Sequence, residues 1–172
     1  RSGPFLTRLA FVSDRDGGGN KEVYLMDMDG DNQRRLTYHK SLSLAPDFSN
    51  DSSMIVYQSY LKGQPGLFVL PKEGGQTRQI PVTTTLNASP SFSPDAKLIA
   101  YCGSVRGNPE IFSVALDGSN QNRLTESSAI DSTPRFAPNG RELVFTSNRQ
   151  GTPQIYTMDV DGEYVVDTGH IV

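Results

Sequence analysis

The residue types that most often carry catalysis or bind metals are few in this chain and far apart. The two histidines are His39 and His170 and the single cysteine is Cys102, so no set of His and Cys has the spacing of a zinc site. The sequence also lacks a Gly-x-Ser-x-Gly nucleophile elbow and any paired carboxylates outside turn-like segments. We therefore expect no catalytic residue, no metal ligand and no cofactor, and we expect His39 to lie exposed in a loop.

One acidic segment, Asp27-Met28-Asp29-Gly30-Asp31, has the composition of a calcium loop. In an EF-hand loop the glycine is sixth and a glutamate is twelfth. Here the glycine is fourth and the twelfth residue is Tyr38. Because Asp-Gly is a strong signal for a tight hairpin turn, the segment is predicted to be a turn and not a metal site.

These turns belong to an internal repeat of 44 residues. The phrases "APDFSNDSSMIVY", "SPSFSPDAKLIAY" and "TPRFAPNGRELVF" begin at residues 45, 89 and 133. Glycine recurs at the same interval, as Gly30, Gly74, Gly118 and Gly162. One interval, from Phe11 to Tyr57, is 46, and its two additional residues fall in "DRDGGGNKE", which we predict to be a loop. Several residue classes kept in phase indicate repeated structural units.

Each unit contains four strand-like segments, which in the third copy are 90–93, 97–102, 110–116 and 121–125. The second segment, "LIAY", is apolar at every position, which is typical of a strand covered on both faces. The fourth is polar and basic, as suits an outer edge, so Arg34-Arg35 is predicted to be a solvated rim pair. The sequence therefore predicts an all-β fold, a β-propeller of about four 44-residue, four-stranded antiparallel blades. A single domain, 1–172, would contain blade units of about 5–44, 45–88, 89–132 and 133–172.

The connectors that lead from one blade to the next are the candidate binding elements. Each connector ends just before a proline, which suits the first residue of a strand and favours an extended predecessor. In a meander these connectors share one end with the Ser-x-Arg loops, and they vary more between copies than the strands do. We therefore predict that they ring the mouth of a central channel, although they could also serve only to connect blades. The candidate partner-binding residues are Ser43, Leu44, Leu86, Asn87, Ala88, Ser89, Asp131, Ser132 and Thr133.

Two Ser-x-Arg motifs, Ser13-Asp14-Arg15 and Ser147-Asn148-Arg149, have two interpretations. Their arginines could grip an acidic partner. Alternatively, Asp or Asn closes a turn while Arg packs on the neighbouring blade. We favour the structural interpretation, because a motif written into several blades usually serves the blade.

Composition argues against two classes of partner. Sixteen Lys and Arg against nineteen Asp and Glu give a net charge of −3, so the chain has no field that would hold a phosphate backbone, and nucleic acid is not expected. The longest apolar runs are about five residues, far below the roughly 20 needed to cross a bilayer, so membrane insertion is not expected. One cysteine cannot form an internal disulfide and indicates no redox compartment.

The segments "SPSFSPDAKLIAY", "FVSDRDG", "VYLMDMDG" and "NQRRLT" together resemble the TolB family of WD-repeat-like β-propellers, over about residues 8 to 162. The opening "GPFLTRLAFVSDR" is similar to the start of the propeller in that family. The resemblance implies a non-catalytic, periplasmic protein of the Tol–Pal envelope system. Its propeller would dock the lipoprotein Pal over the channel mouth, while a separate N-terminal domain deals with TolA. The resemblance also implies that a calcium ion could bind in the channel, for which no residues are identified.

Two departures from that family shape the expectation. TolB propellers have six blades, whereas this chain accounts for about four, starts at a second strand and ends in "EYVVDTGHIV", which abandons the Arg-Leu-Thr pattern. An open arc leaves apolar blade faces in water, which costs a free energy of about 25 cal/mol per Å² of apolar surface. We therefore expect a partial propeller that closes by association, including self-association. The alternative is the gating propeller of an oligopeptidase-type α/β-hydrolase, which would need a separate domain with Ser, Asp and His.

Overall fold

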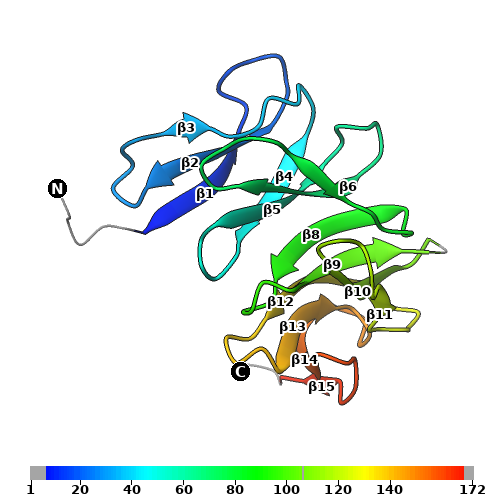
Figure 1. Cartoon of the computed structure of the whole chain (residues 1–172). Coiled ribbons are helices and arrows are strands. Elements are labelled where there is room, and N and C mark those ends of the chain that lie inside the picture. Colours follow the sequence, from blue (N-terminus) through cyan, green and yellow to red (C-terminus); the bar gives the residue numbers. More distant parts are fainter. Residues whose placement is uncertain (1–6, 106, 169–172) are drawn as a thin grey trace.

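A computed structural model describes residues 7–105 and 107–168 of the chain. In these residues the secondary structure consists of strands, which form four antiparallel sheets arranged side by side in an arc (Figure 1). The first sheet has three strands and each of the others has four, in chain order. The prediction of an all-β, partial propeller is confirmed. No helix long and apolar enough to span a membrane occurs in the described part of the chain.

We number the sheets as blades 1 to 4. Blade 1 contains β1 (Arg8–Ser13), β2 (Glu22–Asp27) and β3 (Arg34–Arg35). Blade 2 contains β4 (Ser43–Phe48), β5 (Met54–Ser59), β6 (Gly66–Pro71) and β7 (Arg78–Ile80). Blade 3 contains β8 (Leu86–Phe92), β9 (Leu98–Ser104), β10 (Pro109–Ala115) and β11 (Asn122–Arg123). Blade 4 contains β12 (Asp131–Phe136), β13 (Glu142–Ser147), β14 (Gln154–Asp159) and β15 (Val166–Asp167).

The hydrophobic core lies between the blades. In β9, Ile99 and Tyr101 pack in a cluster shared with blade 2, while Ala100, which points the opposite way, packs in a cluster shared with blade 4. A third cluster joins blades 1 and 2 in the same manner. A middle strand therefore has no solvent-exposed face, which is why the sequence of its central segment does not alternate between apolar and polar residues. The first strands β4, β8 and β12 pack against one another along the inside of the arc.

Each of these inner strands contains the same irregularity, which corrects one prediction. The ladder register shifts within each strand, and at each shift the residue before proline has a left-handed backbone. These residues are Ala45, Ser89 and Thr133, with φ of 49°, 50° and 51°. The prediction of an extended residue at these positions was wrong: a β-bulge absorbs the proline, whose ring disfavours only the right-handed helical conformation of its predecessor. As a result, the strand continues upstream of the bulge.

The Asp-Gly turns have a second role beyond closing hairpins. The turn predicted for 27–31 is confirmed, because the Asp29 carboxylate accepts a hydrogen bond from the Asp31 N–H at 3.1 Å. In blade 4 the corresponding glycine, Gly162, has φ 90° and touches the preceding blade. A Cβ placed on it would lie 2.5 Å from the carbonyl oxygen of Leu124. The glycine therefore permits both the turn and the close approach of blades.

Arginines of the outermost strands β3 and β7 also join blades at the rim. Arg34 donates from Nη1 to the carbonyl oxygen of Glu73 at 2.9 Å and from Nη2 to that of Lys72 at 2.8 Å. Its repeat equivalent, Arg78, donates to the carbonyl oxygen of Leu116 at 2.6 Å. The prediction of a merely solvated rim was wrong for Arg34, because each guanidinium reaches the carbonyl groups of the next blade.

Candidate protein-binding site at the channel mouth

The nine predicted partner-binding residues lie on one face of the arc of blades, at the same end of the strands. In the ladders, Ser43 pairs with Ser59 and Asp131 pairs with Ser147, so inner strands begin where second strands end. We call this end the mouth end and the opposite one the turn end. The structure brings the candidates together there, because β4, β8 and β12 are neighbours. They lie in strands, however, and their assignment to connectors was wrong, since the strands extend past the bulge.

Three polar candidates at equivalent positions are buried and have structural partners. Ser43, Asn87 and Asp131 are 0%, 4% and 0% exposed. The Ser43 hydroxyl hydrogen-bonds that of Ser59 at 3.2 Å, and the Asn87 amide donates to the carbonyl oxygen of Pro65 at 2.8 Å. These side chains fix the mouth end and are not available to a partner. The half-buried or exposed candidates are Leu44, Leu86, Ala88, Ser89, Ser132 and Thr133.

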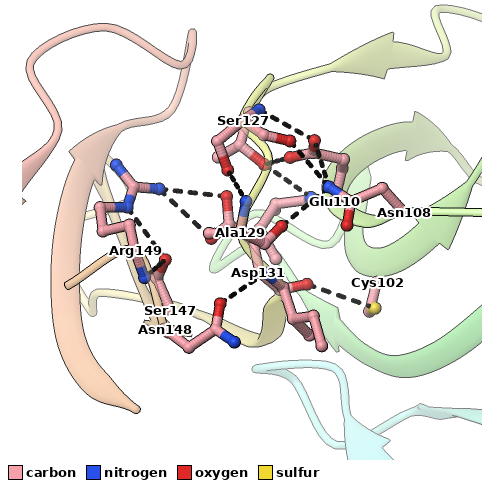
Figure 2. Close-up of polar contacts among 12 residues, drawn as sticks. Cys102, Asn108, Glu110, Ser127, Ala129, Asp131, Ser147, Asn148 and Arg149 are labelled. Atoms are coloured by element: carbon pink, nitrogen blue, oxygen red, sulfur yellow. Dashed lines mark hydrogen bonds and ion pairs between the residues drawn. The ribbon is translucent and has the colours of Figure 1, made fainter. Parts of the chain in front are cut away.

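Asp131 explains the Ser-x-Arg motif. Its carboxylate accepts from Nη2 of Arg149 at 3.1 Å, and Nε of the same arginine donates to the Ser147 hydroxyl at 2.9 Å (Figure 2). The guanidinium also lies 4.7 Å from the ring centroid of Tyr156. Arg149 therefore has structural partners, as the structural interpretation predicted, but the Asn148 amide oxygen accepts from the Ile130 N–H at 2.7 Å instead of closing its own turn. The arginine packs on its own blade, and not on the neighbouring blade as predicted, because the loop folds back over its own aromatic residues.

Two buried glutamates at the mouth end were missed. Glu110, 1% exposed, accepts from Arg123 at 3.0 Å and from the Thr125 hydroxyl at 2.6 Å. It also accepts from the Ser127 N–H at 2.9 Å (Figure 2). These bonds anchor the connector that leads into blade 4. The sequence signal was a glutamate followed 13 and 15 residues later by Arg and Thr, which occurs in blades 1 and 3.

The equivalent glutamate of blade 1, Glu22, is held in the same way. It accepts from Arg35 at 2.8 Å, from Thr37 and from the Lys40 N–H at 2.8 Å. Burial raises the pKa of Glu22, but the hydrogen bonds from Thr37 and the backbone outweigh burial and bring that pKa below its ordinary value. Arg35 is thus paired with a buried carboxylate, and its assignment to a solvated rim was wrong.

The candidate nucleophiles and bases are packed as structural groups. His39 is half-buried, and its Nε2 lies 2.8 Å from the Tyr57 hydroxyl, so its predicted exposure in a loop was wrong. Burial lowers the pKa of His39. Burial also raises the pKa of the Cys102 thiol to about 11, so this thiol stays protonated at neutral pH. The second histidine, His170, lies outside the described residues.

A pair of cavities opens beside the two glutamates. One, of about 340 Å³, is lined in part by Asn108, Glu110 and Arg123, and the other, of about 200 Å³, by their equivalents Asn20, Glu22 and Arg35. Glu22 accepts three hydrogen bonds and Glu110 accepts four, the fourth from the Asn108 amide at 3.0 Å, so neither offers a free base. Among residues 7–105 and 107–168, no three His, Cys, Asp or Glu side chains are placed to hold a metal ion. The channel calcium that the resemblance implies stays a prediction.

The comparisons with known proteins agree with this geometry. Residues 1–169 match the family model PD40, the TolB beta propeller domain. The Tol-Pal system protein TolB of Desulfosudis oleivorans is 42% identical over 67 residues, which are 39% of this chain and 15% of that protein. The crystal structure of TolB from Acinetobacter baumannii superposes with a TM-score of 0.82 and 28% identity, over 96% of this chain and 42% of that one.

Enzymes share the fold as well. A puromycin hydrolase mutant superposes with a TM-score of 0.69 over 93% of this chain and 28% of that one, but at 14% identity the likeness shows the fold alone. The chain spans 15% of the length of the Desulfosudis TolB and 42% of the length of the Acinetobacter TolB. From the repeat, the arc of blades and the family match over 1–169, we conclude that this chain belongs to the TolB beta propeller family.

Proposed function

We propose that this propeller is a non-catalytic protein-binding module of the periplasm that docks a partner such as Pal over the mouth end. One observation carries the proposal: connectors of different sequence converge on the mouth end of a TolB-family propeller. The relatives are named as Tol-Pal system proteins, which makes Pal the first partner to test. In this proposal the buried Ser43, Asn87 and Asp131 hold the surface in shape, and the more exposed Ser132 and Thr133 face the partner.

Calorimetric titration with purified Pal tests the proposal. We expect saturable binding by the wild-type chain and weaker binding by Ser132→Arg/Thr133→Arg, because the larger side chains at these two positions block close approach of the partner. The matched control is Asn139→Arg, an exposed turn-end position, which should bind as the wild type does. Absence of any heat of binding with Pal would overturn the proposed function.

The proposal also concerns the faces of the blades at the two ends of the arc, which have no neighbouring blade within the described chain. Ile111 of blade 3 is 0% exposed against blade 4, whereas its equivalent, Ile155 of blade 4, is 48% exposed. We propose that a second copy of the chain covers such faces through self-association. Sedimentation at increasing protein concentration should show larger species, and a monomer at every concentration would contradict this part of the proposal.

A further inference from the structure

An arc of apolar side chains is exposed at the mouth end. Leu42, Leu86 and Ile130 recur every 44 residues, each directly before one of the buried polar positions. Leu42 is 39% exposed, Ile130 is 50% exposed and Leu86 is half-buried. Since the inner strands that these residues introduce pack side by side, the three side chains form neighbouring steps around the inside of the arc.

A second row of apolar residues lies beside the first. Leu61 and Val105, also 44 apart, are 39% and 58% exposed in the loops after β5 and β9. Backbone contacts tie these loops to the first row: the Tyr60 N–H donates to the carbonyl oxygen of Leu42 at 3.0 Å, and Leu86 pairs with Ser104. We call Leu42, Leu61, Leu86, Val105 and Ile130 the apolar arc. Exposed apolar side chains gathered in this way mark interaction surfaces.

Lysines without ion-pair partners flank the apolar arc. Lys21, Lys40 and Lys62 are exposed, and within the described residues none of their ammonium groups forms an ion pair. Lys21 bridges to Leu42, and its carbonyl oxygen accepts from the Ser43 N–H at 2.7 Å. Lys40 and Lys62 lie within two residues of Leu42 and Leu61 along the chain.

This positive charge is local, because the chain as a whole carries −3. At the turn end the exposed charges are mainly aspartates of the hairpin turns, such as Asp29, Asp51, Asp95, Asp117 and Asp161. Asp14, Asp16 and Glu126 are also exposed at the mouth end, but Asp16 and Glu126 are paired with Arg35 and Arg123. The three unpaired lysines therefore distinguish the mouth end from the aspartate-rich turn end. Surfaces that associate specifically carry complementary charge, so the mouth end favours an acidic partner.

We propose that the apolar arc and the three lysines form the contact surface, and that the partner is a polypeptide presenting apolar side chains flanked by carboxylates. The proposal rests on the proposed docking function and specifies the chemistry of the partner. Leu42, Leu86 and Ile130 are the anchors. The lysines steer the acidic partner toward them.

Removing the anchors tests the apolar part. In titrations with purified Pal, Leu42→Ser/Leu86→Ser/Ile130→Ser should lower the affinity by about 100-fold, since central apolar anchors carry much of the binding free energy. The matched control is Met28→Ser, which removes an apolar side chain that is 58% exposed at the turn end. Thermal melts of both variants verify that the fold persists. Equal affinity of the anchor variant and the wild type would overturn the proposal.

Reversing charge tests the lysines. Lys21→Glu/Lys62→Glu should slow association by about tenfold at low salt, because long-range attraction acts on the encounter rate. Lys72→Glu/Lys97→Glu changes the charge by the same amount toward the turn end and should leave the association rate unchanged. Equal effects of the two pairs would contradict a specific role for the mouth-end lysines.

A second probe separates this inference from the proposed function. A short synthetic peptide of alternating Glu and Leu should bind the full chain and shift the NMR methyl signals of Leu42, Leu86 and Ile130. Its counterpart with Lys in place of Glu should not. Binding of the acidic peptide without binding of Pal would overturn Pal docking and support the contact surface. Binding of Pal that ignores the anchor substitutions would support docking and overturn the contact surface, and failure of both probes would overturn both.

Discussion

The mouth end and the turn end of the blades are stabilised in different ways. At the turn end, in six of the hairpins, a side-chain oxygen accepts a hydrogen bond from the backbone N–H two residues later. The residues that supply this oxygen are Asp29, Asp51, Asp95, Asp117, Asn139 and Asp161. At the mouth end, Glu22, Glu110 and Asp131 are buried and pair with arginines 13 to 18 residues away.

This difference explains why one end repeats and the other varies. A turn that saturates its own polar groups needs no neighbour, so the same short sequence serves in every blade. A connector held by a buried carboxylate needs only a few fixed donors, and its remaining residues are free to differ. The mouth end therefore combines a rigid base with a variable surface, which is the arrangement expected of a binding site.

The largest expected effect comes from removing a buried carboxylate that supports the mouth end. Glu110→Ala should lower the free energy of unfolding by about 3 kcal/mol, because it leaves Thr125 and the Ser127 N–H without their acceptor. Arg123 is 37% exposed and stays solvated, which keeps the loss at the low end for a buried pair. Urea denaturation measures the change. Glu126→Ala, which removes the exposed partner of the same arginine, is the control and should cost less than about 0.5 kcal/mol.

A smaller effect should separate two turn-end glycines. Gly30 and Gly162 have φ of 89° and 90°, but only Gly162 lies against another blade. Gly30→Ala should cost about 1 kcal/mol through backbone strain alone. Gly162→Ala adds a clash with the backbone of Leu124 and should cost about 3 kcal/mol. Equal losses in thermal denaturation would show that turn-end glycines serve the hairpin only.

The smallest effect concerns acid. Hydrogen bonds from Ser49 and Ser53 lower the pKa of Asp51 from 3.8 to about 2. A lowered folded-state pKa stabilises the protein above the unfolded-state pKa, and this contribution is lost as pH falls through the folded-state pKa. Asp51→Asn should therefore have a lower Tm than the wild type above about pH 5, and the gap should narrow between about pH 4 and pH 2. A gap that stays constant down to pH 2 would contradict the local hydrogen bonds.

Much of the turn end followed from local sequence. The Asp-Gly and Pro-Asp signals predicted hairpins because their side chains bond to their own backbone. The unbroken apolar run "LIAY" predicted a strand covered on both faces because each blade is packed between two others. The family resemblance over most of the chain followed from the same repeated segments.

The mouth end could not be predicted to the same depth. Asn87 and Asp131 are polar residues three positions before a proline, and nothing local shows that the strand passes the bulge and buries them. Glu22 and Glu110 are each followed at a fixed spacing by the Arg and Thr that hydrogen-bond them. These partners meet only when β2 pairs with β3 and β10 pairs with β11.

The sequence by itself determined the blade, its period and its turns, because those depend on hydrogen bonds and packing preferences within a few residues. Only the tertiary structure decided which mouth-end residues are buried supports and which are free surface. That outcome depends on where neighbouring strands and blades remove water from a side chain, and residues far apart in the chain control it.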